Sequence, residues 1–153
     1  MSYFRNSNIY YIRSAANGLV DDKENIKGFF YDHGLKTLMN SDRNLDINQK
    51  GGWNNSTALM LAVQKKQTNV IDFLLNNKVR IDEQNIAGNS ALMIAAIYGN
   101  FEQLKQLMEH EYLRPDIDIK NKYDQSAVML AVEKGHVEIA KYLADKVIPP
   151  RIY

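Results

Sequence analysis

Thr57-Ala58-Leu59-Met60-Leu61-Ala62 is the first of three closely similar six-residue stretches in the chain. It returns at residues 90–95 as Ser-Ala-Leu-Met-Ile-Ala and at residues 126–131 as Ser-Ala-Val-Met-Leu-Ala. The first residues of the copies are 33 positions apart (57 to 90) and then 36 positions apart (90 to 126). A period in this range is typical of helical units that stack on one another, so it predicts an all-α solenoid.

The second copy shows the parts from which each unit is built. A polar segment with Asn and Gly (residues 80–89) precedes it and is typical of a turn or short hairpin. Ser90 stands at the N-cap of a short apolar helix predicted over residues 91–96. Gly99 interrupts this helix, and apolar residues recur at helical spacing over residues 101–108. Each unit is therefore predicted to be a hairpin, a short helix, a turn and a longer amphipathic helix.

The other two units contain the same parts in the same order. Ser126 is the predicted cap of the third unit, and Gly135-His136 is its turn. In the first unit Thr57 is the predicted cap, and Lys66-Gln67 forms a turn without glycine. None of these helices could bury its apolar face alone, so we expect the units to stack.

This pattern resembles the ankyrin repeat, whose first helix carries the signature T-P-L-H-x-A. Alanine replaces the signature proline and methionine replaces the signature histidine in every copy (Ala58, Ala91, Ala127; Met60, Met93, Met129). The resemblance covers about residues 45–147 and implies repeats at about 45–79, 80–115 and 116–147. It implies an all-α ankyrin-repeat solenoid of stacked helix-turn-helix units with short β-hairpin loops.

Two irregularities in length interrupt the repeat. The first hairpin (residues 51–55) is one residue longer than the other two, and about three extra residues lie around 110–115. Insertions in solenoids map to loops, often on the binding face. Loop extensions are also tolerated at little cost in free energy, so for the second irregularity both interpretations stay open.

Residues 1–44 match the repeat poorly. Residues 22–32 and 34–41 are predicted to form the helix pair of a degenerate N-terminal capping repeat, as terminal repeats are often atypical. An amphipathic helix predicted over residues 6–18 lies outside the pattern. It is a cap extension, a remnant of a larger upstream domain, or an independent partner-binding element.

At the other end, residues 45–153 comprise the three repeats and a short tail. Pro149-Pro150 ends the last helix, because proline cannot continue it. Either the third repeat is its own cap or the tail folds back on it. The first alternative predicts that four charged side chains of the last helix face water: Glu138, Lys141, Asp145 and Lys146.

The resemblance implies a binding surface made of the hairpin tips and the exposed side of each first helix. Trp53, Tyr98 and Tyr123 are its candidate anchors, since aromatic side chains offer a large contact area and a polar atom. The alternative is that Trp53 packs on its own hairpin and the tyrosines lean on neighbouring repeats. The full predicted set is Trp53, Asn54, Ser56, Gln64, Lys65, Ile86, Ala87, Asn89, Ile97, Tyr98, Lys122, Tyr123, Gln125, Glu133 and Lys134.

Composition narrows the class of partner. The formal net charge is +1, and the predicted surface carries charges of both signs, which argues against binding to phosphate backbones. No apolar run reaches the roughly 18 residues of a membrane span. There are no cysteines and the N-terminus lacks the pattern of a signal peptide. We therefore expect a cytoplasmic, monomeric protein that binds another protein, with no nucleic acid or membrane partner.

The sequence carries no pattern typical of catalysis. It lacks a G-x-G-x-x-G stretch, a P-loop, an H-E-x-x-H motif and an EF-hand loop. His136 is predicted to be structural, and His110 shares no helix face with its neighbours Glu109 and Glu111. Asp21, Asp22 and Glu24 fit an acidic helix N-terminus. We predict no enzyme activity and no catalytic, cofactor-binding or metal-binding residues.

These observations favour a protein–protein interaction module. Two alternatives stay open. The chain could be the interaction domain of a larger enzyme or of an effector delivered into a host cytosol. It could also be an inhibitor or antidote that blocks an enzyme's active site with its hairpin tips.

Overall fold

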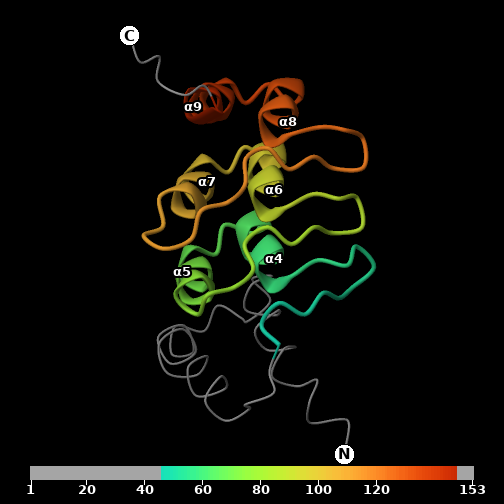
Figure 1. The fold of residues 1–153 in the computed structure, drawn as a ribbon, viewed down its shortest axis with the longest axis vertical. Coiled ribbons are helices and arrows are strands. Elements are labelled where there is room, and N and C mark those ends of the chain that lie inside the picture. Colours follow the sequence, from blue (N-terminus) through green and yellow to red (C-terminus); the bar gives the residue numbers. More distant parts are fainter. Residues whose placement is uncertain (1–45, 148–153) are drawn as a thin grey trace, which may run out of the picture.

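The computed structural model describes residues 46–147, which form a stack of three helical layers (Figure 1). Each layer has an inner helix beside the projecting loops and an outer helix on the other side (Figure 1). The layers are α4 (Ala58–Gln64) with α5 (Thr68–Asn76), α6 (Ala91–Tyr98) with α7 (Phe101–Met108), and α8 (Ala127–Glu133) with α9 (Val137–Val147). This confirms the predicted all-α solenoid, while the predictions for residues 1–44 and 148–153 lie outside the described residues.

The inner helices begin where the sequence predicts caps. The hydroxyl of Thr57 accepts a hydrogen bond from the Met60 amide at 3.3 Å, and Ser90 and Ser126 each cap their helix in the same way. The Thr57 amide in turn donates to the Met60 sulfur at 3.4 Å. The methionine that replaces the signature histidine therefore still makes a reciprocal, weak capping bond in the first repeat.

The turns between inner and outer helices use backbone with positive φ. Gly99 and Gly135 have φ of 71° and 77°, and Lys66 adopts φ of 56° where the first turn lacks glycine. A Cβ on Gly99 would lie 2.6 Å from the His136 ring, so this turn requires glycine for two reasons. His136 Nε2 donates to the Ile97 carbonyl at 3.0 Å, which confirms its structural role.

The turn of the middle layer makes an equivalent bond to the layer before it. Asn100 follows Gly99 as His136 follows Gly135, and it is buried. Its side-chain amide donates to the Val63 carbonyl at 2.8 Å. Each of these two inter-layer junctions is therefore fixed by one polar side chain that satisfies a helix-terminal carbonyl.

The core is one apolar cluster that runs through all three layers. Residues 91–96 of α6 are all buried, because α4 packs on one side of this helix and α8 on the other. Small side chains in the inner helices allow this close approach. The outer helices contribute large residues to the same cluster: Ile71, Leu74, Leu104, Leu107, Ile139 and Leu143.

The predicted hairpins are turn-like loops. Within residues 46–147 there is no regular strand, and an isolated antiparallel bridge joins Gly51 and Ser56. The first loop encloses four residues between these partners, and the other two loops enclose three residues each, which confirms the predicted extra residue. A backbone hydrogen bond of 3.0 Å closes each shorter loop, from Asn85 to Asn89 and from Asn121 to Gln125.

Candidate functional site

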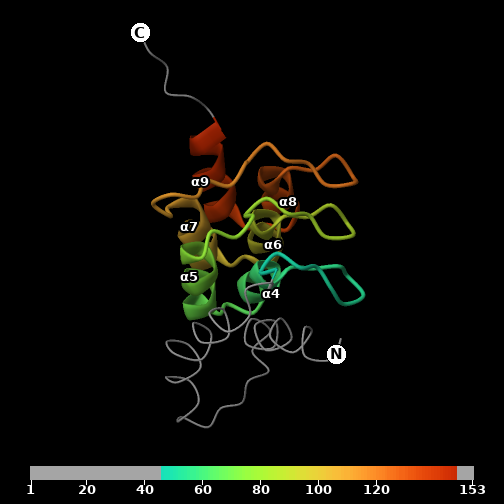
Figure 2. The ribbon, with the colours of Figure 1, turned by 60° about the horizontal axis from the view of Figure 1, so that its bottom comes forward.

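Three loops project side by side from the same side of the stack, next to α4, α6 and α8 (Figures 1 and 2). Each carries one large apolar side chain near its tip. Trp53 is 94% exposed, Tyr123 is 75% exposed, and Ile86 between them is also exposed. Tyr98, at the end of α6, is a fourth exposed apolar side chain. We call these four residues the loop-tip cluster.

The two shorter loops owe their shape to an asparagine at the first position. The side-chain oxygen of Asn85 accepts from the amides of Ala87 and Asn89, both at 3.0 Å. The equivalent oxygen of Asn121 accepts from the amides of Tyr123 and Gln125, at 2.9 and 3.0 Å. Because these bonds replace water around the loop amides, the tips are held in one conformation.

Hydrogen bonds also join each loop to the next. The Ile86 amide donates to the Asn54 carbonyl, and the Lys122 amide donates to the Ala87 carbonyl, both at 3.1 Å. Gly88 allows the third loop to come close enough for the hydrogen bond between Lys122 and Ala87. It has φ of 78°, and a Cβ there would lie 2.8 Å from the Lys122 nitrogen. The three loops therefore form one continuous and ordered edge.

Polar side chains orient the helical part of the surface. Gln64 Nε2, at the end of α4, donates to the Tyr98 hydroxyl, at the end of α6, at 3.1 Å, and so joins two adjacent layers. In the third repeat, the Gln125 amide donates to Glu133, whose carboxylate also lies 3.6 Å from Lys134. Charges of both signs thus lie close together, which gives the surface no strong net field.

The structure places most predicted contact residues at the surface. Trp53 cannot be packed on its own loop, given its exposure, so that alternative is wrong. Tyr98 is an intermediate case, since its hydroxyl is hydrogen-bonded to the preceding layer yet the residue is exposed, whereas Tyr123 is 75% exposed. Exposed residues of the set are Trp53, Lys65, Ile86, Tyr98, Lys122, Tyr123, Glu133 and Lys134, and half-buried ones are Asn54, Gln64, Ala87, Asn89, Ile97 and Gln125.

Ser56 is a correction to the predicted set. Its residue is 4% exposed, and its backbone pairs with Gly51 in both directions at 3.0 Å. Its hydroxyl accepts from the side-chain amide of Asn54 at 3.3 Å. Ser56 therefore closes the first loop and offers no surface for a partner.

Two carboxyl groups with shifted pKa values lie at the base of the loops, between layers. A hydrogen bond from Lys50, 2.9 Å away, holds the pKa of Glu83 below its usual value, with smaller help from Arg80. Burial raises the pKa of Asp82, although its carboxylate accepts from the Asp116 amide at 2.9 Å. Both groups bridge neighbouring repeats, so we assign them to stability.

Within the part of the chain that the structure describes, no three His, Cys, Asp or Glu side chains are grouped so that they could hold a metal ion. None of the helices between residues 46 and 147 has both the length and the apolar character needed to cross a bilayer.

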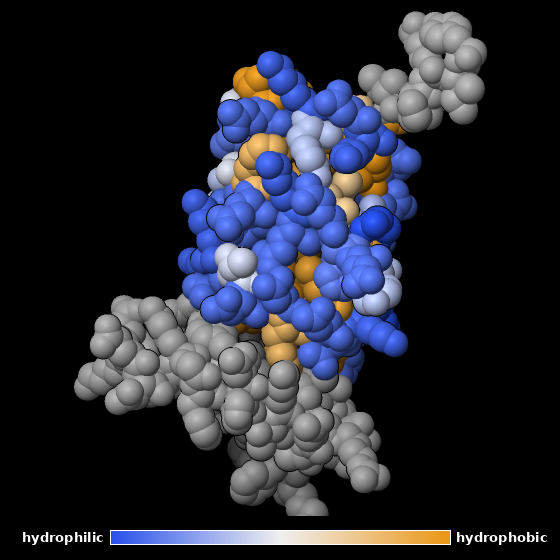
Figure 3. Space-filling model, turned by 90° about the vertical axis from the view of Figure 1, so that its left-hand side faces the viewer, coloured by the Kyte–Doolittle hydropathy of each residue, from blue (hydrophilic) through white to orange (hydrophobic). Residues whose placement is uncertain are grey.

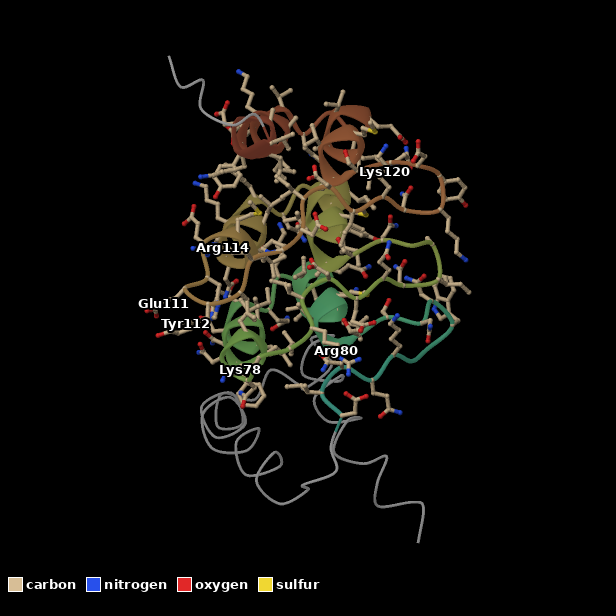
Figure 4. The ribbon with its side chains drawn as sticks, in the orientation of Figure 1. Lys78, Arg80, Glu111, Tyr112, Arg114 and Lys120 are labelled. Carbon is tan, nitrogen blue, oxygen red and sulfur yellow. The ribbon has the colours of Figure 1, made fainter. Side chains whose placement is uncertain are left out.

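The insertion around residues 110–115 lies away from the loop-tip cluster. Figure 4 shows Glu111 and Tyr112 at the opposite edge, beside α5 and Lys78. His110 Nδ1 accepts from the amides of Tyr112 and Leu113 at 3.3 and 3.2 Å, so the loop is internally ordered. Sequence spacing located this loop but carried no signal for the side of the solenoid on which it lies.

Comparison with known proteins finds a matching family model and several similar proteins. The family model "Ankyrin repeats (3 copies)" matches residues 28–121 and 59–151. The chain is 30% identical over 132 residues to "Ankyrin repeat and KH domain-containing protein mask-1" of Caenorhabditis elegans, covering 86% of this chain and 5% of that protein. It is 27% identical over 105 residues to "Alpha-latrocrustotoxin-Lt1a" of Latrodectus tredecimguttatus, covering 69% and 7% respectively.

The chain thus spans less than a tenth of the length of these two curated relatives. The family match extends over most of the chain and includes all three capped inner helices. Ankyrin repeats are in general protein-interaction modules and are typically non-catalytic. Together with the stacked helix pairs and the projecting loops, these matches show that the chain belongs to the ankyrin repeat family.

Proposed function

We propose that this protein binds another protein through its loop-tip cluster and the adjoining side of α6 and α8, without catalysis. The observation that supports this most directly is the exposure of Trp53, Ile86 and Tyr123 on loops that are hydrogen-bonded to one another, with Tyr98 exposed beside them at the end of α6. Large aromatic side chains in fixed positions are the residues that most often dominate binding energy at protein interfaces.

The order of the loops reduces the entropic cost of binding. In the two shorter loops the amides are already satisfied within the loop or by the neighbouring loop, so binding a partner does not require their backbone to fold. The buried area would be that of a standard interface, roughly 800 Å² on each partner. We expect little change in the position of the loop backbone between the free and the bound protein.

The charges favour a protein over a nucleic acid. Lys65, Lys122 and Lys134 are exposed on this surface, but Asp124 and Glu133 are exposed beside them. A nucleic acid partner requires clustered cations without acidic neighbours. The partner that fits has an apolar or aromatic patch at its centre and mixed polar groups around it. Binding of an enzyme at its active site would be one such case.

The test compares the wild-type protein with the variant Trp53→Ala, Tyr98→Ala, Tyr123→Ala in affinity capture from a lysate of the native source. Tyr112→Ala is the matched control, since Tyr112 is an exposed aromatic residue at the opposite edge. Each captured protein is then purified and titrated against all three forms. We expect the triple variant to weaken binding by about 100-fold or more, because interface anchors typically contribute 2 kcal/mol or more each.

The variants also need to keep their fold. We expect unchanged circular dichroism and nearly unchanged thermal unfolding for all of them, since none of the four side chains belongs to the core. A partner that binds the triple variant as tightly as the wild type would rule out the loop-tip cluster as the site. A partner lost only with Tyr112→Ala would move the site to the insertion loop.

A further inference from the structure

The C-terminal ends of the three inner helices bring equivalent residues into one row. Lys65, Tyr98 and Lys134 each stand eight positions after the cap of their helix (57 to 65, 90 to 98 and 126 to 134), and all three are exposed. Because α4 packs on α6 and α6 on α8, neighbours in this row lie one layer apart, about 8–10 Å for packed helices. We call these three residues the helix-end row. It adjoins the loop-tip cluster, to which Tyr98 also belongs.

The Tyr98 hydroxyl is held in place and keeps a proton to donate. Its oxygen accepts a hydrogen bond from Gln64 Nε2 at 3.1 Å. Gln64 is the residue before Lys65, so the hydroxyl lies close to the Lys65 end of the row. A tyrosine hydroxyl can donate one hydrogen bond while it accepts another. In the described part of the chain no acceptor takes this proton, so a partner can supply one.

The charge of Lys65 is not used within the described residues. No carboxylate among them lies within ion-pair distance of this exposed lysine. A lysine at the end of a helix often donates to the last carbonyls. Here the Asn100 side chain donates to the Val63 and Gln64 carbonyls at 2.8 and 3.3 Å. The Lys65 and Gln67 amides satisfy the two preceding carbonyls at 3.0 and 2.8 Å, so the ammonium is free for another acceptor.

The two ends of the helix-end row differ in charge. Lys134 lies 3.6 Å from Glu133, and this exposed pair lowers the net charge at the α8 end. Lys65 is followed by Lys66, which is also exposed, so positive charge is concentrated at the α4 end. An ammonium near a hydroxyl proton forms a set of donors without an acceptor. A carboxylate matches this set, because an ionised carboxylate only accepts hydrogen bonds.

From these donors we infer that the partner docks a linear acidic segment on the helix-end row, with one carboxylate bound by the Lys65 ammonium and the Tyr98 hydroxyl. The inference rests on the proposed function, since the apolar residues of the same segment would contact the loop-tip cluster. It narrows the partner to proteins whose binding segment joins aromatic or aliphatic residues to Asp or Glu. Charge complementarity of this kind contributes to specificity and to the rate of association.

The first test is a selection of short random peptides against the full chain. We expect the recovered peptides to be enriched in Asp and Glu beside apolar residues. Selection against Lys65→Glu should enrich Lys and Arg instead, because the charge at this position is reversed. Lys78→Glu is the matched control. It reverses an exposed lysine at the opposite edge of the stack (Figure 4), next to the mostly hydrophilic outer-helix side (Figure 3), and should leave the recovered peptides unchanged.

The second test titrates one recovered acidic peptide against single variants of the chain. Lys65→Gln and Tyr98→Phe should each weaken its binding by about tenfold, because each removes one donor to the carboxylate. Tyr98→Phe keeps the aromatic ring, so its effect reports the hydroxyl alone. Exchange of the acidic residue of the peptide for its amide should weaken binding to the wild type and have less effect on the two variants. All variants are first checked for unchanged circular dichroism.

Several outcomes would overturn the inference. The selection could return no peptide, or peptides without enrichment of acidic residues. Acidic peptides could also bind Lys65→Glu as tightly as the wild type, which would place the carboxylate elsewhere. The triple variant Trp53→Ala, Tyr98→Ala, Tyr123→Ala separates this inference from the proposed function. Peptides that lose binding to it but lack acidic residues contradict the present inference alone, whereas peptides that bind it unchanged contradict both.

Discussion

The α6/α7 layer and the α8/α9 layer carry nearly the same inner-helix sequence, but among residues 46–147 the former has a layer packed on each side and the latter on one side. Residues 91–96 of the middle layer are all buried. In the last layer Ala127, Leu130 and Ala131 are buried, while Met129 and Val132 are exposed. Equal sequence thus yields unequal burial, because a helix in a stack acquires half of its environment from the next layer.

The same contrast holds for the turns that follow these helices. Gly99 is closed in by the His136 ring of the next layer, whereas nothing lies within 4 Å of a Cβ placed on Gly135. Both glycines have positive φ, so the local backbone is the same. The two glycines differ in whether a side chain of another layer packs against them. Matched substitutions in the two layers therefore separate local contributions to stability from those that depend on stacking.

The largest expected difference is between the two signature-position methionines. Met93→Ala should lower the free energy of unfolding by about 2–5 kcal/mol, because it leaves a cavity in the packed core. Met129→Ala should cost less than about 1 kcal/mol, since half of that residue is exposed. Urea unfolding at low protein concentration measures both. Equal costs would show that the last layer is packed as tightly as the middle one.

The next largest difference is between Gly99→Ala and Gly135→Ala. Positive φ alone should cost each variant about 1 kcal/mol. Gly99→Ala should cost about 2–3 kcal/mol in total, because its Cβ also meets the His136 ring. Adding His136→Ala to Gly99→Ala should cost less than the sum of the two single changes. Strict additivity would mean that the ring moves aside without cost.

Lys66 permits a smaller test in the opposite direction. It holds φ of 56° at the position that glycine occupies in the other two layers. Lys66→Gly should therefore raise the free energy of unfolding by up to about 1 kcal/mol, because the strain of the left-handed backbone is removed. Lys65→Gly is the control, since φ there is −93°, and it should bring no gain. Thermal unfolding distinguishes the two, and equal shifts would contradict the strain argument.

The smallest expected effect is a change of stability with pH, and it comes from a contact between the outer helices of these two layers. The change takes place only in alkaline solution. The Tyr142 hydroxyl donates to Glu109 at 2.8 Å, and burial together with this bond raises the pKa of Tyr142 to about 12. The raised pKa stabilises the folded state below pH 10, and this contribution is lost between pH 10 and about pH 12.

Comparison of the wild type with Tyr142→Phe over that pH range isolates the effect, because all other groups titrate in both proteins. The difference in stability should shrink as pH rises toward 12. A difference that stays constant through this range would show that Tyr142 keeps no special contact with Glu109.

Much of the fold was predictable because its signals are local. Thr57, Ser90 and Ser126 cap their helices as predicted, since a cap depends on residues within one turn. The extra residue of the first loop was also visible when the three hairpin segments were compared. The reciprocal bond from Thr57 to the Met60 sulfur was not predictable, because methionine in a helix normally indicates only apolar packing.

The sequence predicted which positions form the candidate surface, but it did not predict the exposure of every side chain at those positions. Trp53 and Tyr123 are exposed as the alignment with the repeat implied, whereas Ser56 is buried where its backbone pairs with Gly51. Sequence alone also left open the side on which the insertion lies, and Figure 4 shows Tyr112, in the loop after α7, at the edge opposite the projecting loops. Binding through the loop-tip cluster itself stays a proposal.

By itself, the sequence determined the repeating unit: where each inner helix begins, where glycine or its substitute turns the chain, and which residues form an apolar stripe. These features follow from hydrogen bonding and backbone sterics among residues close in the chain. The tertiary structure alone decided which copies of the stripe are covered within the described residues and that the loops are hydrogen-bonded into one edge. Burial and hydrogen bonds between loops depend on residues that are close in space but far apart in the chain, so the local sequence of one repeat does not determine them.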